Sequence, residues 1–372
     1  MLDPKAFLDL IKSHGINFST GVPDSLLKDF CGCIADSGSD IIAANEGGAL
    51  ALAAGHHLAT SEIPFVYMQN SGFGNIINPL TSLVDPEVYS IPMLIMVGWR
   101  GEPGIKDEPQ HVKQGRINEA LISALEVRYD VLSEDIAEAT SQVETAVEYM
   151  KSHQAPYILL VRKDTFAPYM MQNLPVVPDY EMNREDAVKE ILNKLSTEDV
   201  VVSTTGKTSR EVFEKRAADQ SGHQRDFLTV GCMGHASQIA LGIALAKPNR
   251  KTYCLDGDGA FIMHMGSAGI IANQAPQNYY HIVINNGAHD SVGGQPTIGF
   301  DLDLGMIAQG AGYKQVYSVS SKNELSHIWS DFTSAEGPVF LEVKTKKGAR
   351  NDLGRPTIKP IDNKKDFMNN LK

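Results

Sequence analysis

The chain has 372 residues, of which 42% are hydrophobic and 21% charged, so it can bury a large core and form two or three domains. A net charge of −12 at pH 7 argues against nucleic acid as a general partner. No basic-plus-apolar leader and no run of about 18 apolar residues is present, which predicts a cytoplasmic protein without a membrane segment.

Cysteine usage points to the same compartment. The four cysteines are Cys31, Cys33, Cys232 and Cys254. Cys31 and Cys33 are too closely spaced for a CxxC pair, and no histidine-rich segment follows them. A zinc site or a disulfide framework is therefore not expected, and a reducing cytoplasm is the default.

Strands and helices alternate along the first half of the chain. Asp3 and Pro4 supply a capping acid and a first-turn proline for a helix that we expect to end near Ser13. The expected strands are short apolar runs at residues 18–20, 41–44, 65–68, 92–97, 129–132 and 157–161. The other expected helices are one capped by Asp24 or Ser25, then 49–59, one after residue 75, one from about 118 after a long polar loop at 98–115, and 136–151. This alternation predicts a parallel sheet covered on both faces.

The second half repeats the alternation after a proline-containing stretch that we read as a linker. Its expected strands are residues 200–203, 228–230, 253–255, 281–284 and 339–343, and its expected helices are 184–195, one ending at 246, 264–273 and 322–332. We therefore predict a first domain at 1–165, a linker at 166–183, a second domain at 184–345, and a basic tail at 346–372. The run 344–360 is expected to be loop-like.

Residues 252–288 contain the most informative pair of motifs. The apolar run 253–255 stops at DGDG (256–259), and the run 281–284 stops at NNG (285–287). Two strands joined by a helix should present their carboxyl ends at one edge of the sheet, where α/β proteins bind ligands. The first motif alone fits an ordinary strand-to-helix turn equally well, whereas the pair is far more specific.

The residue types in these motifs suit a metal and a diphosphate. Asp258 and Asn286 are hard oxygen donors suited to Mg²⁺ or Ca²⁺. With the Ala288 carbonyl they leave octahedral positions for phosphate oxygens and water, which is how Mg²⁺ is usually held. Gly257 and Gly259 allow close approach of the backbone to a diphosphate and offer N–H groups.

Glu46 follows another expected strand end and precedes two glycines and a helix. Taken alone, it fits an acid favoured by the helix dipole in the first turn. Together with the paired motifs, however, the run NEGGA (45–49) resembles the thiamine diphosphate enzymes.

That resemblance implies two doubly wound α/β domains of the thiamine diphosphate-binding fold, one for the pyrimidine and one for the diphosphate, with no middle domain. It implies Mg²⁺ on Asp258, Asn286 and the Ala288 carbonyl, with the cofactor's diphosphate on the metal and against Gly257, Gly259 and the adjoining Ala260. Glu46 would be catalytic, through a hydrogen bond to the aminopyrimidine. It also implies a homo-oligomer, at least a dimer, with active sites shared between subunits.

Further motifs narrow the resemblance to the phosphonopyruvate decarboxylase family. These are GVPDS (21–25), NSG (70–72), GWRG (98–101) and NGAHDS (286–291). The implied reaction is decarboxylation of 3-phosphonopyruvate to phosphonoacetaldehyde and CO₂, in phosphonate biosynthesis. Alternatives are decarboxylation of sulfopyruvate or another small anionic 2-keto acid, carboligation, and a non-catalytic thiamine diphosphate-binding regulatory subunit.

The remaining candidates follow from the substrate's negative charge and from position. Asp24 and His111 are candidate catalytic groups, with His111 expected in the long polar loop. His235 and Asn70 are candidate cofactor contacts. The candidate substrate residues are Ser25, Arg100, Lys207, His289 and Arg350. Among the cations, arginine suits a phosphonate better than lysine because it can bind through two N–H groups.

Overall fold

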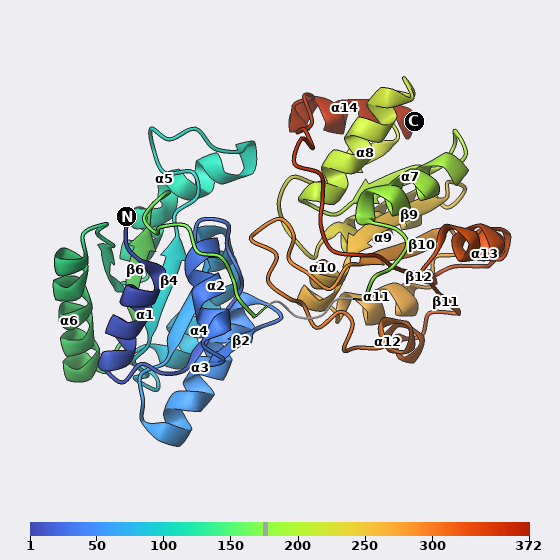
Figure 1. The fold of residues 1–372 in the computed structure, drawn as a ribbon. Coiled ribbons are helices and arrows are strands. Elements are labelled where there is room, and N and C mark those ends of the chain that lie inside the picture. The colour runs from blue at the N-terminus through green and yellow to red at the C-terminus, as the bar shows by residue number, and fades with distance from the viewer. Residues whose placement is uncertain (174–177) are drawn as a thin grey trace. The chain divides into compact units, whose positions relative to one another are not determined.

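The computed structural model describes residues 1–173 and 178–372, which form two compact units, Met1–Pro175 and Val176–Lys372. Each unit contains one six-stranded sheet with helices on both faces (Figure 1). All the strand pairs in both sheets are parallel. The predicted α/β class with two doubly wound parallel sheets is therefore confirmed. The predicted linker, 166–183, includes residues 174–177, which lie outside the described residues.

The first unit has the strand order β2-β1-β3-β4-β6-β5. Its strands are β1 (Ser19–Gly21), β2 (Asp40–Ile42), β3 (Phe65–Gln69), β4 (Leu94–Gly98), β5 (Arg128–Val131) and β6 (Tyr157–Val161). Its helices are α1 (Pro4–Ser13), α2 (Lys28–Asp36), α3 (Glu46–Thr60), α4 (Phe73–Pro79), α5 (Pro109–Ala124) and α6 (Ile136–His153), with short turns η1 (Asn70–Gly72) and η2 (Leu80–Val84).

The second unit repeats that topology, because its sheet read from β8 has the order β8-β7-β9-β10-β12-β11. Its strands are β7 (Val200–Ser203), β8 (Asp226–Leu228), β9 (Thr252–Gly257), β10 (Tyr279–Asn285), β11 (Gln315–Val319) and β12 (Val339–Lys344). Its helices are α7 (Arg184–Lys194), α8 (Lys207–Ala218), α9 (Ala236–Ala246), α10 (Asp258–Met263), α11 (Ser267–Gln274), α12 (Leu304–Ala311), α13 (Lys322–Ser334) and α14 (Pro360–Asn370).

Strand order reverses between the first and third strands of each unit, which are β1 and β3 in one and β7 and β9 in the other. Ligands of open α/β sheets bind at the carboxyl ends of the strands beside such a reversal. The segments that follow these strands are therefore the places to look for function.

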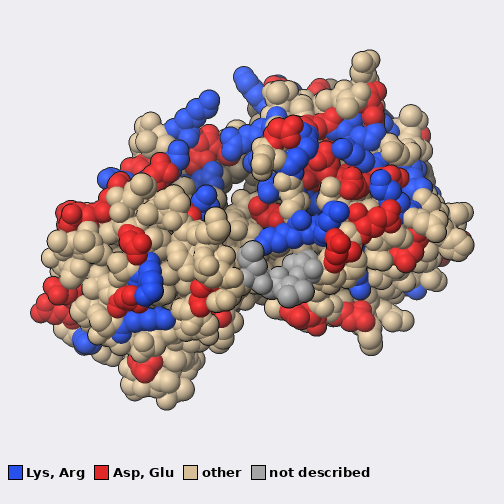
Figure 2. All heavy atoms as spheres, viewed as in Figure 1, with Lys and Arg blue, Asp and Glu red and all other residues tan. Residues whose placement is uncertain are grey.

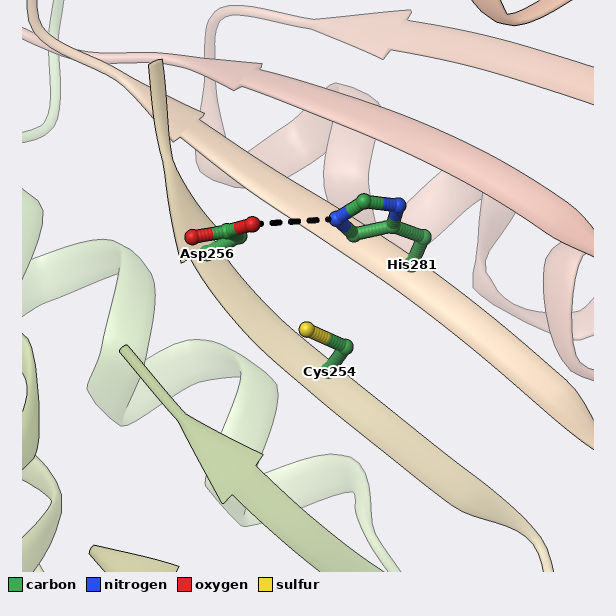
Figure 3. Close-up of side chains that lie close together, drawn as sticks. All are labelled: Cys254, Asp256 and His281. Carbon is green, nitrogen blue, oxygen red and sulfur yellow. Dashed lines mark hydrogen bonds and ion pairs between the residues drawn. The ribbon is translucent and has the colours of Figure 1, made fainter. Parts of the chain in front are cut away.

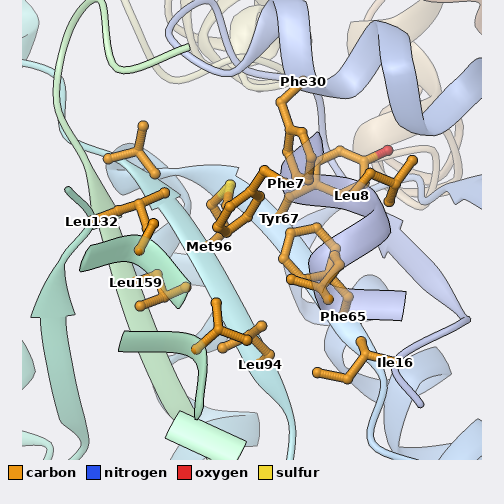
Figure 4. Packing of buried hydrophobic residues seen from close by; sticks show 14 of the residues in the cluster. Phe7, Leu8, Ile16, Phe30, Phe65, Tyr67, Leu94, Met96, Leu132 and Leu159 are labelled. Carbon is orange, nitrogen blue, oxygen red and sulfur yellow. The ribbon is translucent and has the colours of Figure 1, made fainter. Parts of the chain in front are cut away.

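The two faces of the first sheet are buried in separate cores. Phe65 and Tyr67 of β3 point into one cluster, shown in Figure 4, while Val66 and Met68 point into the other. Successive side chains of a strand lie on opposite faces, so a strand covered on both sides reads as one continuous apolar run. This is why the buried strands could be predicted from short apolar runs.

Several element boundaries differ from the prediction, and one difference matters for the site. Helix α5 begins at Pro109 instead of near residue 118, so His111 lies in its first turn and not in a loop. Pro109 at the first helical position is a start signal, since its fixed φ suits a helix and its missing N–H is not needed there. Asp24 and Ser25 do not cap α2, whose N-cap is Leu27.

Beyond the run 344–360, which we expected to be loop-like, the basic tail ends in a helix. Residues 360–370 form helix α14, which packs on edge strand β8 through buried Phe367 and Asn363. The Asn363 amide accepts from Leu228 N at 3.1 Å and donates to the Asp226 carbonyl at 2.8 Å. One side chain thus satisfies two backbone groups that the exposed edge of the sheet would leave unpaired.

Across residues 1–173 and 178–372, the structure contains no helix with the length and apolar character that a bilayer span requires. On the face shown in Figure 2, Lys and Arg side chains are interspersed with Asp and Glu.

Asn363→Ala is expected to lower the free energy of unfolding of the second unit by about 2–3 kcal/mol, because it leaves a buried N–H and a buried carbonyl unpaired. Urea unfolding of the full chain would measure this change. Asn369→Ala is the matched control, since that asparagine is exposed on the same helix. Equal effects of the two substitutions would contradict the edge-pairing role.

Candidate active site

The paired motifs of the second unit meet at the carboxyl edge of its sheet. Gly257, the last residue of β9, is opposite Ile284 of β10 in the parallel register. The next residues along the two strands are Asp258 and Asn285, followed by Asn286. Asp258 and Asn286 are thereby brought together from positions 28 residues apart in the chain.

Asp258 is a buried carboxylate, and a nearby cation would stabilise its charge. It accepts a hydrogen bond from the Thr297 hydroxyl and further ones from backbone N–H groups, including that of Asn286. Burial nevertheless raises its pKa to about 6, because these neutral donors only partly replace lost solvation. A buried carboxylate among oxygen donors is suited to a hard divalent cation.

Asn286 and Asn285 have different surroundings. Asn285 Nδ2 donates into the protein, to the Gly299 carbonyl at 2.7 Å and to Glu342 at 2.8 Å. Asn286 Nδ2 donates to Asp290 at 2.8 Å, and its Oδ1 accepts from Ala288 N at 3.2 Å. The Asn285 side chain thus makes its hydrogen bonds within the protein, at the end of β10. This favours Asn286 as the residue that offers a side-chain oxygen to a metal.

The glycines of the first motif leave room beside these donors. Gly257 has extended backbone, and a Cβ there would enter open space. A Cβ on Gly259 would lie 3.1 Å from the imidazole of His289, so that ring stands against the motif. Ala260 is buried in the first turn of α10. The donor set and the open backbone fit a metal with a diphosphate.

The two histidines predicted near the motif differ. Loss of solvation lowers the pKa of His289 to about 4, so this ring is neutral at pH 7. His235 is exposed at the start of α9, where its Nδ1 lies 3.1 Å from the Met233 carbonyl. Its ring centroid is 4.4 Å from that of His264.

The two basic candidates of this unit are also unequal. Lys207 begins α8 directly after β7, and it is half-buried. Its pKa is lowered by desolvation, an effect that Asp290 opposes. Arg350 instead pairs with Glu185, Glu214 and Asp352. Three carboxylates already neutralise Arg350, which leaves Lys207 as the better anion contact.

A buried polar cluster lies on β9 and β10, where Cys254, Asp256 and His281 are close together (Figure 3). Asp256 Oδ1 accepts from Gly257 N at 3.0 Å, and Asp256 Oδ2 lies 3.4 Å from His281 Nε2. His281 Nδ1 lies 3.0 Å from the Tyr313 hydroxyl, and Cys254 lies beside the pair. The first aspartate of the DGDG run therefore points into the core and fixes the turn.

In the first unit, Glu46 is buried at the start of α3. Asn45 caps the helix by accepting from Gly48 N at 2.9 Å. Glu46 Oε2 accepts from Asn75 Nδ2 at 2.6 Å, and a Cβ on Gly72 would come within 2.7 Å of Oε1. Only glycine fits there, because the Glu46 carboxyl occupies the space of a side chain.

Arg100, which follows β4, organises the remaining predicted residues of this unit. Its Nε donates to Asp107 Oδ2 at 2.8 Å, and Nη1 donates to Ser25 Oγ at 2.6 Å. Asp107 also lies 3.0 Å from His111 Nδ1. Arg100 and His111 hold the pKa of Asp107 far below its usual range despite partial burial.

Asp24 and Asn70 complete this edge of the first sheet. Asp24 is fully buried, and desolvation raises its pKa to about 6 although Arg100 opposes the rise. Asn70 Nδ2 donates to the Arg100 carbonyl at 2.8 Å. Its buried Oδ1 has no hydrogen-bond partner among the described residues, so it can accept from a ligand.

Four contributors were not predicted: Asn75, Asp107, Asp290 and Thr297. Asp107 could have been found, because an acid four residues before His111 beside a helix start predicts a side-chain pair. Asn75 lies 29 residues from Glu46 and Thr297 lies 39 residues from Asp258. No local pattern links such distant residues, so only the folded chain reveals them.

Comparison with known proteins finds matches to both units. The N-terminal and C-terminal TPP binding domains of thiamine pyrophosphate (thiamine diphosphate) enzymes match residues 4–122 and 205–343. A phosphonopyruvate decarboxylase of Streptomyces hygroscopicus is 33% identical over 97% of this chain and 92% of that protein. One from Streptomyces viridochromogenes is 32% identical over 94% and 89%.

A sulfopyruvate decarboxylase of Methanosarcina acetivorans is more distant, at 25% identity over 98% of this chain and 96% of that protein. The matches extend over both units and over nearly the whole length of each relative. The chain therefore belongs to the phosphonopyruvate decarboxylase family of thiamine pyrophosphate enzymes, and the decarboxylases of this family are carboxy-lyases.

Proposed function

We propose that this chain decarboxylates 3-phosphonopyruvate to phosphonoacetaldehyde and CO₂, using thiamine diphosphate and Mg²⁺. The observation that carries the proposal is the buried Asp258 carboxylate beside Asn286 in a chain that aligns end to end with phosphonopyruvate decarboxylases. When bound, the cofactor supplies an electron sink for the electron pair of the carbon–carbon bond that breaks as CO₂ leaves.

The second unit would hold the metal and the diphosphate. Asp258, Asn286 and the Ala288 carbonyl would bind Mg²⁺, which usually combines a few protein oxygens with phosphates and water. Gly257 and Gly259 would lie against the diphosphate, with Ala260 and His235 beside it. His289 would face the substrate as a neutral ring, since its pKa is about 4.

The first unit would hold the pyrimidine and the reacting end of the substrate. Glu46 would share a proton with a ring nitrogen of the pyrimidine, and its contact with Asn75 fixes the carboxyl for this task. Asn70 would accept a hydrogen bond through its unpartnered Oδ1. Asp24 and His111 would act as acid–base groups that donate protons to the substrate or accept protons from it.

The anionic groups of the substrate need positive charge. Arg100 is held rigidly by Asp107 and Ser25, so any N–H it presents is fixed in direction. Lys207 would contribute from the second unit. We leave Arg350 out of the pocket because its charge is already paired.

Sulfopyruvate is the alternative substrate, because a sulfonate differs from a phosphonate mainly in charge. The lower identity to a sulfopyruvate decarboxylase favours phosphonopyruvate. A non-catalytic regulatory subunit is disfavoured by the intact Glu46, Asp258 and Asn286.

The proposed setting is phosphonate biosynthesis in the cytoplasm, in a homo-oligomer of at least two chains with shared active sites. All four cysteines are free thiols, which supports a reducing compartment. The proposed oligomer rests on the resemblance to thiamine diphosphate enzymes, which implies that a site is shared between the pyrimidine-binding domain of one subunit and the diphosphate-binding domain of another.

The direct test is CO₂ release from phosphonopyruvate, sulfopyruvate and pyruvate. We expect the highest kcat/KM with phosphonopyruvate, no turnover without thiamine diphosphate, and loss of activity in EDTA that Mg²⁺ restores. Preference for sulfopyruvate would overturn the substrate, and turnover without the cofactor would overturn the chemistry. Activity that survives prolonged EDTA dialysis, with no metal detected in the protein, would exclude the metal role.

Glu46→Gln is expected to lower kcat by about 100-fold or more, the range for loss of a positioned acid–base group. Steady-state kinetics with saturating cofactor would measure it. The matched control is Glu62→Gln, an exposed residue just after α3, which should retain wild-type kcat. Wild-type kcat in Glu46→Gln would refute the proposed role.

Asp24→Asn is expected to change how stability depends on pH. The folded-state pKa of Asp24, about 6, lies above the ordinary 3.8, so wild-type protein loses stability as pH rises through that window. Asparagine cannot ionise, so the variant should gain on the wild type by up to about 3 kcal/mol between pH 4 and pH 8. Urea midpoints would show this, and exposed Asp9→Asn is the control. A difference in stability between variant and wild type that does not change with pH would contradict a raised pKa of Asp24 in the folded protein.

A further inference from the structure

Asp290 is a shared acceptor beside the candidate metal ligands. It lies in the segment after β10, and its side chain is only 6% exposed. Its Oδ2 accepts from Asn286 Nδ2 at 2.8 Å, from Arg184 Nη1 at 2.8 Å and from Gly348 N at 3.2 Å. One carboxylate oxygen therefore joins the segments that follow β10 and β12 to the start of α7.

Arg184 is itself held in place from the other side. Its Nε donates to Glu211 Oε2 at 2.9 Å and its Nη2 donates to Glu211 Oε1 at 2.8 Å. The Arg184 side chain is 7% exposed and the Glu211 side chain is fully buried. A two-point contact with a carboxylate fixes the plane of the guanidinium, so Arg184 presents Nη1 to Asp290 in one direction.

The chemistry of this chain of contacts determines which way the Asn286 amide faces. An ionised carboxylate only accepts hydrogen bonds, so the amide must turn its NH₂ group toward Asp290. The opposite orientation would set the amide oxygen against a carboxylate oxygen in a buried place, where an unpaired polar contact is costly. The oxygen of Asn286 is therefore directed away from Asp290. It accepts from Ala288 N at 3.2 Å, and its second lone pair is left for a metal.

The charges of the group also favour a cation. Arg184 is opposed by two carboxylates, those of Glu211 and Asp290, and Asp258 adds a third buried acid nearby. Lys207 also faces Asp290 and offsets part of this charge. In a buried setting with few mobile ions, an excess of negative charge raises the affinity for a divalent ion.

We propose that Asp290, held by Arg184, is a positioning residue that orients the Asn286 oxygen toward the metal. This inference rests on the proposed function, because it assumes that Asn286 is a metal ligand. Asp290 itself need not touch metal, cofactor or substrate. Its effect should therefore appear in metal affinity, which a merely stabilising contact would leave unchanged.

The test measures binding of Mn²⁺, a stand-in for Mg²⁺, to the full chain with saturating thiamine diphosphate. Free Mn²⁺ is followed by its electron paramagnetic resonance signal, so no turnover is needed. Asp290→Asn is expected to weaken Mn²⁺ binding by about 10–100-fold, the usual cost of losing a partner that orients a metal ligand. Affinity within about twofold of the wild type would overturn the proposal, because that lies well below the expected range.

The matched control is Asp226→Asn. Asp226 also forms a buried pair with an arginine, Arg216 Nε at 3.0 Å, but it lies at the amino end of β8, the opposite edge of the sheet. Both variants lose a buried charge contact, so both should melt at lower temperature. Only Asp290→Asn should lose metal affinity, and an equal loss in Asp226→Asn would overturn the proposal.

Two further variants complete the design. Asp290→Ser removes the carboxylate without placing an amide beside Arg184, so it serves if Asp290→Asn does not fold, with the same expected loss. In an Asn286→Ala background, Asp290→Asn should add almost nothing. A further loss of about tenfold there would mean that Asp290 acts independently of Asn286, which would overturn the proposal.

Asn286→Ala alone separates the two levels of inference. If it binds Mn²⁺ as the wild type does, Asn286 is no ligand, and both the proposed metal site and the role of Asp290 fail. If it loses Mn²⁺ while Asp290→Asn keeps wild-type affinity, the proposed metal site stands and only the positioning role fails.

Discussion

The second unit is organised around a buried carboxylate at the end of a parallel strand. Asp258 loses solvation when the chain folds, and neutral donors such as Thr297 recover only part of it, which raises its pKa to about 6. The register of β9 with β10 also brings Asn286, which follows the neighbouring strand, to the same edge of the sheet. A cation at that edge would relieve the cost, and this supports the proposed metal site.

The two units share one topology but place different residues on it. Both sheets have the same strand order, and in both the polar residues lie after strands beside the reversal of that order. In the first unit these residues are Asp24 after β1 and Asn70 after β3. In the second they are Lys207 after β7 and Asp258 after β9. The common architecture supplies the position, and the residues placed there supply the chemistry.

In each unit, the candidate site relies on an arginine that is held by a carboxylate. Arg100 is fixed by Asp107 and reaches Ser25, while Arg184 is fixed by Glu211 and reaches Asp290. Arginine suits this role because its planar group can bind a carboxylate through two N–H bonds and still present another. Breaking such a pair leaves a buried charge without a partner, so these contacts position side chains strictly.

The sequence by itself determined the α/β class and the pair of motifs on which the proposed metal and diphosphate site rests, because apolar runs, helix signals and short motifs are local patterns. It also pointed to Glu46 through a local run. Only the tertiary structure decided that His111 lies on α5 and that the tail forms α14. The partners of the key groups, Asn75, Thr297 and Asp290 with Arg184, also came from the fold. Their contacts join segments far apart in the chain, where side-chain packing and the satisfaction of buried charges, not local pattern, determine what meets.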